Sequence, residues 1–440
     1  MVLGERVRAT PLPARFASRQ ARIGVIGLGY AGLPMALEIA AAGFGVVGID
    51  VEPSKIALVN GGRSPVSDVS DEQLQPLVQE GLLQATSDYA ALAAVDAVII
   101  CVPTPLARGK QPDLSYVEAA TRGIAQYLHR DMLVALQSTS RPGTTREVML
   151  PILEATGLRV GEDYFLAFAP ERIDPGNQRY TVSNTPKLIG GITPACTEVA
   201  CELYRHFIDR LVPVSSPEVA ELSKLVENTF RFINISFVNE LALLCDRMGV
   251  NVWDVIDAAA TKPFAFLPHY PGPGVGGHCI PVVPFYLEAA AQQYGLRAGL
   301  IKEAGRVNDA MPIFVVDKAE RLLRERGDAP ARPRLLLIGI TYKANIRDLR
   351  ESAALAVLRE CISRGHDVVY HDPLVESVEV GGFQIASVAL TPDEVRRADC
   401  VILLTSHSTL DRELLLTQSR LLLDTQNTFR GQPRANVVPL

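Results

Sequence analysis

The chain has 440 residues, of which 48% are hydrophobic and 21% charged, a composition typical of a globular protein with an ample core. At about 150 residues per domain, this length predicts two to four domains. No apolar run approaches the ~20 residues that span a bilayer, and the net charge of −6 argues against nucleic acid as the main ligand. The composition therefore excludes an integral membrane protein and predicts no nucleic-acid partner.

The cysteines and the N-terminal segment indicate a reducing compartment. The seven cysteines are scattered, odd in number and form no CxxC pair, so we expect mostly buried thiols, no metal site and no disulfide framework. Residues 1–20 are rich in arginine and lack the apolar segment of a signal peptide. We expect these twenty residues to be a flexible tail, and the protein to be cytoplasmic.

From residue 21 the chain alternates between strand and helix patterns. RIGVIG (22–27) reads as a buried strand closed by glycine, and 31–42 as a helix. Further short apolar runs predict strands at 46–50, 96–102, 132–137, 164–168 and 187–189. Strands separated by helices predict a doubly wound parallel sheet, which we place in a Rossmann-like domain at 21–213.

The segment 214–325 is predicted to be helical. Apolar residues recur at helical spacing from 217 to 248, which predicts one long helix or two, and further helices are expected over 252–260, 284–293 and 301–326. Helices with such wide apolar faces often bury them in a symmetric partner. We therefore expect a central dimerisation domain and a homodimer.

Strand and helix patterns return at 326–440, after a charged linker with two prolines at 326–334. Strands are expected at 334–339, 368–371, 400–404 and 421–423, and a helix at 352–364. GFGVVGID (43–50) has the spacing of GHDVVYHD (365–372), and DAVII (96–100) that of DCVIL (399–403). The sequence thus predicts an α/β protein with two Rossmann-like doubly wound units joined by a helical domain.

A glycine-rich turn marks the expected cofactor site. GLGYAG (27–32) fits GxGxxG, follows a strand, opens a helix and precedes Asp50 at the end of the next strand. In this context Gly27 permits the turn, Gly29 the approach of a pyrophosphate and Gly32 the packing of the helix, while Asp50 accepts from ribose and favours NAD over NADP. The alternative is a purely structural turn, and Thr104 in CVPTP (101–105) is either a crevice residue or a turn cap.

The loop PGPGVGGHCIP (271–281) is the densest unusual segment and a candidate chemical site. Its glycines leave the backbone open to a ligand, and Cys279 stands near its end beside His278. The alternative is a buried structural cysteine. On the helix from 217, Lys224 and Asn228 share one face and can converge on one substrate, unless the lysine only extends to solvent.

Polar residues also follow the predicted strands. Glu171, and Ser138 with Thr139, lie at the carboxyl edge of the sheet where ligands bind, although each can equally be a surface or capping residue. In the second unit Gly339 is not followed by GxGxxG, so a second dinucleotide is not expected. Three cations follow this strand and predict a diphosphate site or a solvated basic loop: Lys343, Arg347 and Arg350.

These motifs, taken in order from about Arg22 to Asn427, resemble the nucleotide-sugar 6-dehydrogenases, which act on UDP-glucose, UDP-N-acetylhexosamines or GDP-mannose. The matching stretches are GLGYAG, CVPTP, QSTSRPGT (137–144), APERIDPG (169–176), ELSKLVENTFRFINISFVNE (221–240), GPGVGGHCIP and YKANIRDLRES (342–352). APERIDPG and GGHCIP are most similar to the N-acetylhexosamine branch. The resemblance implies oxidation of the alcohol at carbon 6 to a carboxylate, with two NAD reduced.

The resemblance also implies roles for individual residues. Cys279 would be the nucleophile that forms a thiohemiacetal and then a thioester. Lys224 and Asn228 would hold the reacting oxygen, Glu171 would orient water or act as base, and Thr139 would lie near cofactor and water. Further substrate contacts are expected from Arg172, Arg231, Gly276, Gly277 and Lys343. The expected cofactor contacts are Gly27, Gly29, Tyr30, Ala31, Gly32, Asp50, Lys55, Val102, Pro103, Thr104, Ser138, Thr139 and Arg350.

One departure from the family pattern concerns the residue four positions after the cysteine. Family members usually carry aspartate there, where this chain has Val283. We hypothesise that turnover persists with slower thioester hydrolysis. Two alternatives stay open: a two-electron dehydrogenase of the hydroxyacid type, and a nucleotide-sugar-binding protein with impaired catalysis.

Overall fold

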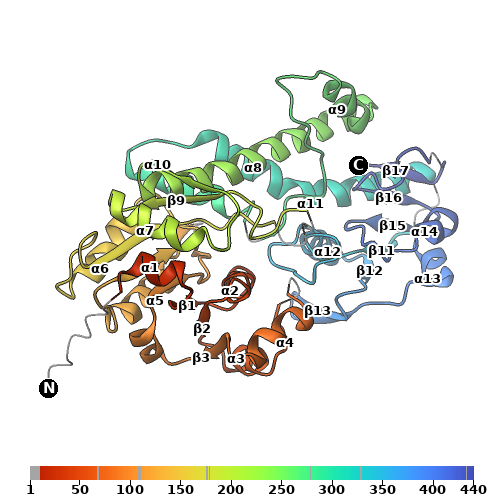
Figure 1. Ribbon diagram of the computed structural model, residues 1–440. Coiled ribbons are helices and arrows are strands. Elements are labelled where there is room, and N and C mark those ends of the chain that lie inside the picture. The colour runs from red at the N-terminus through yellow and green to blue at the C-terminus, as the bar shows by residue number, and fades with distance from the viewer. Residues whose placement is uncertain are drawn as a thin grey trace. The chain divides into compact units, whose positions relative to one another are not determined.

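The computed structural model describes residues 10–66, 69–107, 111–174, 177, 179–277, 279–327, 330–432 and 434–440. The chain forms two compact units, each with its own sheet (Figure 1). The first unit comprises Met1–Glu227 with Phe285–Leu296, and the second comprises Asn228–Pro284 with Arg297–Leu440. The predicted α/β class with two Rossmann-like sheets and a helical middle is confirmed, and the residues of that middle are divided between both units.

The first unit contains an eight-stranded sheet in the order β10-β9-β8-β7-β4-β1-β2-β3. Its central strands are apolar on both faces, which is why they form the buried core. The strands are β1 (Arg22–Ile26), β2 (Gly45–Ile49), β3 (Leu83–Thr86), β4 (Ala97–Ile100), β7 (Met132–Leu136), β8 (Tyr164–Phe168), β9 (Lys187–Gly191) and β10 (Leu211–Pro213).

Two strands, β9 and β10, run opposite to the other six, against the prediction of a wholly parallel sheet. β9 pairs antiparallel with β8, whereas the other neighbours in the sheet are parallel. A parallel return needs a crossover, usually a helix. None of the described residues between Phe168 and Lys187 is helical, so the chain turns back directly. As a result the first residue of β9 lies beside the carboxyl end of β8.

Helices cover the sheet of the first unit, and α2 packs on β1 and β2 (Figure 1). A two-stranded hairpin of β5 (Leu106–Ala107) and β6 (Gln111–Pro112) adds to them. The helical elements are α1 (Leu12–Ala17), α2 (Gly32–Ala41), α3 (Pro53–Asn60), α4 (Asp71–Gln79), η1 (Tyr89–Ala94), α5 (Ser115–Ala125), η2 (Thr144–Met149), α6 (Leu150–Glu154) and α7 (Pro194–Tyr204).

Helix α1 lies within the segment expected to be a flexible tail, and corrects that expectation for residues 12–17. Leu12 and Phe16, one turn apart, are fully buried, and Arg15 forms a 3.0 Å ion pair with the buried Asp96. A proline suits the first turn of a helix, and Pro13 is the second residue of α1. An apolar face with a paired charge therefore docks this segment onto the unit.

The second unit contains a parallel five-stranded sheet in the order β12-β11-β15-β16-β17. Helix α11 packs against α12 beside it (Figure 1). The elements are α9 (Val252–Ala260), α11 (Gly299–Arg326), β11 (Arg334–Ile338), α12 (Ala353–Ser363), β12 (Asp367–His371), β13 (Ser377–Val380), β14 (Phe383–Ala386), α13 (Pro392–Arg397), β15 (Cys400–Leu403), α14 (Arg412–Gln418), β16 (Leu422–Asp424) and β17 (Val437–Pro439). Two further helices, α8 (Pro217–Met248) and α10 (Val283–Gln293), contribute residues to both units.

The two sequence segments with equal spacing, 96–100 and 399–403, also form equivalent hydrogen bonds. Asp96 accepts from the amide of Arg22 at 2.8 Å and returns its own amide to the Arg22 carbonyl at 2.7 Å. In the second unit Asp399 and Arg334 make the same two bonds, at 2.8 and 2.9 Å. The two Rossmann-like units are thus built on one local pattern.

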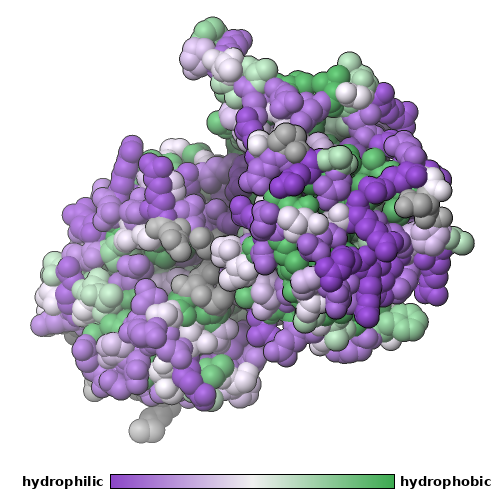
Figure 2. All heavy atoms as spheres, turned by 90° about the vertical axis from the view of Figure 1, so that its right-hand side faces the viewer, coloured by the Kyte–Doolittle hydropathy of each residue, from purple (hydrophilic) through white to green (hydrophobic). Residues whose placement is uncertain are grey.

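The face of the protein drawn in Figure 2 is mainly hydrophilic, with apolar residues spread between the polar ones. No helix within the described ranges is long and apolar enough to cross a membrane. Of the seven cysteines, six are buried and Cys279 is partly exposed, as the expectation of mostly buried thiols requires.

Candidate functional site

The glycine turn between β1 and α2 has the geometry that a dinucleotide needs. Gly27 has φ of +91°, and a Cβ there would lie 2.6 Å from the Cys101 carbonyl oxygen. A Cβ on Gly32 would lie 1.7 Å from the Gly27 carbonyl oxygen, so the helix can begin this close only with glycine. By contrast, nothing lies within 4 Å of a Cβ built on Gly29. This open backbone at a helix N-terminus fits a pyrophosphate.

Asp50 follows β2 and faces the same turn. Its Oδ2 accepts from the Leu28 amide at 2.8 Å and its Oδ1 from the Glu52 amide at 3.0 Å. A carboxylate oxygen can accept more than one hydrogen bond, so Asp50 retains capacity for ribose hydroxyls. The residues therefore fit NAD. Lys55, also predicted to contact the cofactor, pairs with Glu52 at 3.0 Å.

The ends of β4 and β7 supply the next predicted cofactor residues. Ser138 donates to the Val102 carbonyl at 2.8 Å, which joins the two segments. Thr104 is held from its other side, because the Tyr286 hydroxyl donates to its carbonyl at 2.8 Å. Sequence reasoning missed Tyr286, whose pKa burial raises to about 12. The remaining predicted contacts within this unit are partly or fully exposed: Tyr30 and Ala31 in the glycine turn after β1, Pro103 after β4 and Thr139 after β7.

Glu171, after β8, is held by four donors. Its Oε1 accepts from the amides of Arg172 at 2.8 Å and Ile173 at 3.0 Å. Its Oε2 accepts from the Gln137 side chain and lies 3.1 Å from Lys187 Nζ. Lys187 is 3% exposed, and burial lowers its pKa while the Glu171 carboxylate opposes that shift. These contacts fix the position of the Glu171 carboxylate.

Sequence reasoning missed Lys187. The available signal was a lysine among only eight in the chain, at the start of an otherwise apolar strand. Its partner could not be foreseen, because the predicted parallel direction of β9 places Lys187 at the opposite edge of the sheet. The antiparallel direction brings it to Glu171.

The predicted pair on α8 is buried. Lys224 is 7% exposed and Asn228 6%, and they follow one another by one helical turn. Among the described residues the Asn228 Nδ2 has no hydrogen-bond partner, so a buried donor is available for a ligand.

Glu221, one turn before Lys224, anchors this part of α8. It accepts from the amides of Gly143 at 2.6 Å and Thr145 at 2.9 Å and from the Thr145 hydroxyl at 2.7 Å. Burial raises the pKa of Glu221 to about 7, against the effect of these donors. The helix turn that carries Lys224 is therefore attached to the segment that follows β7.

The two arginines predicted to bind substrate differ in their surroundings. Arg172 pairs with Glu227 at 2.6 Å and donates to the Pro186 carbonyl at 2.7 Å. Arg231 is exposed on α8. Arg172 is thus fixed in place, while Arg231 is solvated.

In the second unit, Gly276 and Gly277 of the glycine-rich loop pack closely against the segment that follows β11. A Cβ on Gly276 would lie 2.8 Å from Tyr342 Cβ and 3.0 Å from the Glu351 carbonyl oxygen. Gly277 has φ of +91°, its Cβ would lie 2.8 Å from the Tyr342 ring, and its amide donates to the Arg350 carbonyl at 3.2 Å. The residues that resemble a catalytic loop and a diphosphate loop therefore lie side by side.

Cys279 comes at the end of this loop, just before α10. Its carbonyl accepts from the amides of Val282 at 3.3 Å and Val283 at 2.9 Å. Val283 is 2% exposed. His278 lies outside the described residues.

In the predicted cationic loop, Arg350 pairs with a neighbouring acid. The Arg350 guanidinium contacts the Asp348 carboxylate at 2.6 to 3.0 Å. Lys343 is partly buried and Arg347 exposed.

Comparisons with known proteins agree along the chain. Family models for the UDP-glucose/GDP-mannose dehydrogenase family match three segments: the NAD binding domain at 21–208, the central domain at 218–310 and the UDP binding domain at 336–431.

Three similar proteins illustrate the agreement. The chain is 38% identical to an NDP-N-acetyl-D-galactosaminuronic acid dehydrogenase of Ralstonia nicotianae, covering 93% of this chain and 96% of that one. It is 37% identical to a UDP-N-acetyl-D-glucosamine 6-dehydrogenase of Pseudomonas aeruginosa, covering 81% and 83%. The solved structure of a UDP-D-ManNAc dehydrogenase from Pyrococcus horikoshii superposes with a TM-score of 0.84 at 34% identity, covering 95% and 98%.

Proposed function

Because the chain belongs to the UDP-glucose/GDP-mannose dehydrogenase family and is an NAD-dependent oxidoreductase of nucleotide sugars, we propose that it oxidises carbon 6 of a UDP-N-acetylhexosamine to the carboxylate. The names of relatives with 37 to 38% identity support an N-acetylhexosamine. The observation that carries the chemistry is Cys279, the one cysteine that is partly exposed, at the end of a glycine loop packed on the segment with Lys343.

The proposed reaction uses the Cys279 sulfur as a temporary carrier of the acyl group. NAD, when bound, accepts one hydride in each of the two oxidations. The alcohol first loses a hydride and a proton and becomes an aldehyde. The thiolate adds to the aldehyde carbon, the adduct loses a second hydride to give a thioester, and water releases the carboxylate and the thiolate. One sugar therefore consumes one water and yields two NADH and three protons.

Three side chains of the described site support these steps. Lys224 and the unpartnered donor of Asn228 are suited to hold the reacting oxygen and stabilise its negative charge. Glu171 is suited to orient water, because its four donors fix the direction of its carboxylate. We assign it this orienting role in place of a free base.

The test of the proposed function is a panel of nucleotide sugars with NAD, followed by NADH formation and product analysis. Two NADH per UDP-N-acetylhexosamine and little turnover of UDP- or dTDP-glucose are expected. One NADH per substrate would instead indicate a two-electron dehydrogenase. Binding without NADH would indicate a nucleotide-sugar-binding protein, for which Val283 is the only supporting observation.

Replacing Val283 with aspartate is expected to speed up thioester hydrolysis. Val283 is the buried first residue of α10, four positions after Cys279, where relatives usually carry a carboxylate. In rapid mixing, the first NADH phase should stay unchanged and the steady-state rate should rise about ten-fold, in the lower range of general base catalysis. The matched control is Val282→Asp, which should not accelerate turnover. An unchanged rate in both phases of V283D would contradict a hydrolytic role for this position.

We also propose that the protein is a homodimer through α8. Along this helix, exposed apolar side chains recur at intervals of three, four or seven residues, as on a helix face that packs against another helix. They are Val219, Leu222, Val226, Phe230, Phe237, Leu244 and Met248. The loop at 267–273 adds the exposed Leu267 and Tyr270. Sedimentation should give twice the mass of one chain, and a monomer would contradict this proposal.

A further inference from the structure

The carboxylate that ends β12 repeats the arrangement of the NAD-side carboxylate in the first unit. Asp372 Oδ2 accepts from the Ile340 amide at 2.7 Å, and Oδ1 accepts from the Leu374 amide at 2.9 Å. Asp50 has two equivalent partners. One is the amide of the residue that follows the turn glycine, and the other is the amide two positions after the aspartate itself. Asp372 thus occupies the position at which a Rossmann-like unit binds ribose.

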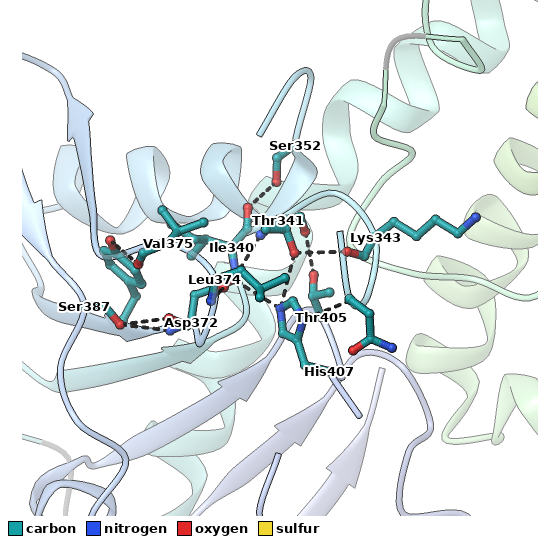
Figure 3. Close-up of polar contacts among 12 residues, drawn as sticks. Ile340, Thr341, Lys343, Ser352, Asp372, Leu374, Val375, Ser387, Thr405 and His407 are labelled. Atoms are coloured by element: carbon teal, nitrogen blue, oxygen red, sulfur yellow. Dashed lines mark hydrogen bonds and ion pairs between the residues drawn. The ribbon is translucent and has the colours of Figure 1, made fainter. Parts of the chain in front are cut away.

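The second unit adds a histidine that closes this position. His407 Nε2 lies 3.2 Å from Asp372 Oδ2 (Figure 3), the His407 residue is 2% exposed and the Asp372 side chain is fully buried. Burial pushes the pKa of Asp372 upward, but His407 and the backbone amides hold it below its usual value. In the first unit, the segment after β4, CVPTP at 101–105, contains no histidine and no charged residue. The Asp372 carboxylate is therefore bound by groups of the protein itself, whereas the Asp50 carboxylate can still accept from a ligand.

The second nitrogen of His407 connects this pair to the loop that carries Lys343. His407 Nδ1 accepts from the Asn345 amide at 3.0 Å, so Nδ1 carries no proton and Nε2 is the donor. Thr341 donates to the Lys343 carbonyl at 3.1 Å, and its hydroxyl lies 3.3 Å from His407 Nε2. The backbone of Lys343 is therefore held on both sides, and its side chain points away from the cluster (Figure 3).

The backbone of Asn345 would not hold this shape without support. Asn345 has φ of +64°, in the left-handed region that costs energy for a residue other than glycine. Its side-chain oxygen accepts from the amide and the hydroxyl of Ser408, at 2.9 and 3.0 Å. The segment from His407 to Ser408 thus fixes a strained turn directly after Lys343.

We propose that His407 is a positioning residue for the nucleotide sugar, because it holds the Lys343 loop in the shape that receives the substrate's diphosphate. Together, His407 and Asp372 occupy the position where a Rossmann-like unit usually binds ribose. In this unit the buried pair stabilises the Lys343 loop. This inference rests on the proposed function, in which Lys343 contacts the substrate. It assigns His407 and Asp372 an indirect role, without contact to the reacting atoms.

The two nitrogens of His407 can be tested separately. In His407→Asn, the side-chain oxygen can replace Nδ1 and accept from the Asn345 amide, while the contact to Asp372 is lost. In His407→Gln, the amide can reach Asp372, while the Asn345 amide loses its acceptor. Since losing one hydrogen bond costs up to about a ten-fold change in affinity, H407Q should raise the KM for the nucleotide sugar and the Kd for UDP by about ten-fold. H407N should stay near the wild type, and the KM for NAD and kcat at saturation should change less than about two-fold in both variants.

The control is the same pair of substitutions at His366, which pairs with Glu320 at 2.8 Å near the surface of the same unit. Both should leave the KM values unchanged. Should H407Q fold poorly, Thr341→Val removes the hydroxyl bond to the Lys343 carbonyl without touching the buried pair, and should raise the same KM about three-fold. Unfolding temperatures identify a purely structural effect.

Two outcomes would overturn the proposal. One is that H407Q and T341V lower the unfolding temperature but leave the KM for the sugar and the Kd for UDP at their wild-type values. The other is that the KM for NAD rises as much as that for the sugar. Either result leaves the proposed function intact if the wild type forms NADH from a UDP-N-acetylhexosamine. If the wild type neither binds UDP nor forms NADH, the proposed function itself fails.

Discussion

Replacing Cys279 with serine is expected to lower the rate of carboxylate formation by about a thousand-fold or more, the size of effect seen when an enzyme loses its nucleophile. A serine hydroxyl is protonated at neutral pH and is a far weaker nucleophile than a thiolate. The glycine loop should keep its shape, since serine fits the space of the cysteine. The measurement is NADH formation together with mass analysis of the sugar product.

The control for this experiment is Cys201→Ser, because Cys201 is 9% exposed and lies on α7 in the first unit. It should retain wild-type kinetics.

Slow hydrolysis with Val283 in place should also let an acyl group accumulate on the wild-type enzyme. Acid quenching followed by peptide mass analysis should place this group on Cys279. A serine variant that forms two NADH per sugar at the wild-type rate would contradict the proposed mechanism.

Replacing Lys187 with methionine is expected to destabilise the protein by about 3–5 kcal/mol, because it leaves the Glu171 carboxylate without its cation in a largely buried site. The remaining donors stabilise only part of the negative charge on Glu171, so the orientation of its carboxylate should become less defined. We expect the hydrolytic phase to slow by about a hundred-fold while the first NADH phase is retained. Urea unfolding and rapid mixing measure the two effects.

The matched variants are Lys187→Arg, which keeps the positive charge, and the double variant K187M/E171Q, which removes both charges. The arginine variant should keep most of the stability. The double variant should recover part of the stability lost in K187M but none of the hydrolytic rate, since the oriented carboxylate is gone. If K187M and K187R had the same stability and the same hydrolytic phase, the ion pair would have no role in either.

Much of the fold follows from local patterns in the sequence. The helix expected at 217–248 is observed as Pro217–Met248, and the strand expected at 132–137 as Met132–Leu136. Apolar periodicity and glycine turns act within a few residues, so they can be read directly from the chain. The glycine turn with Asp50 was predictable for the same reason, because its spacing is specific to one geometry.

The parts that escaped prediction depend on contacts between distant segments. The pairing of Lys187 with Glu171 requires the antiparallel direction of β9, which no local pattern specifies. His407 and Asp372 are 35 residues apart and meet only because β12 and β15 flank β11 in one sheet. The sequence of α1 predicts a tail, because its few apolar residues are significant only against the surface on which they pack.

The matched hydrogen bonds of the two Rossmann-like units have a consequence for what each unit can bind. Both units present a carboxylate beside a glycine turn, so a difference in binding must come from the residues around that carboxylate. Asp50 and Asp372 share this carboxylate arrangement, and His407 is the additional partner of the buried acid in the second unit. One residue at a strand end can thus give two similar scaffolds different tasks without any change in the strands of either sheet.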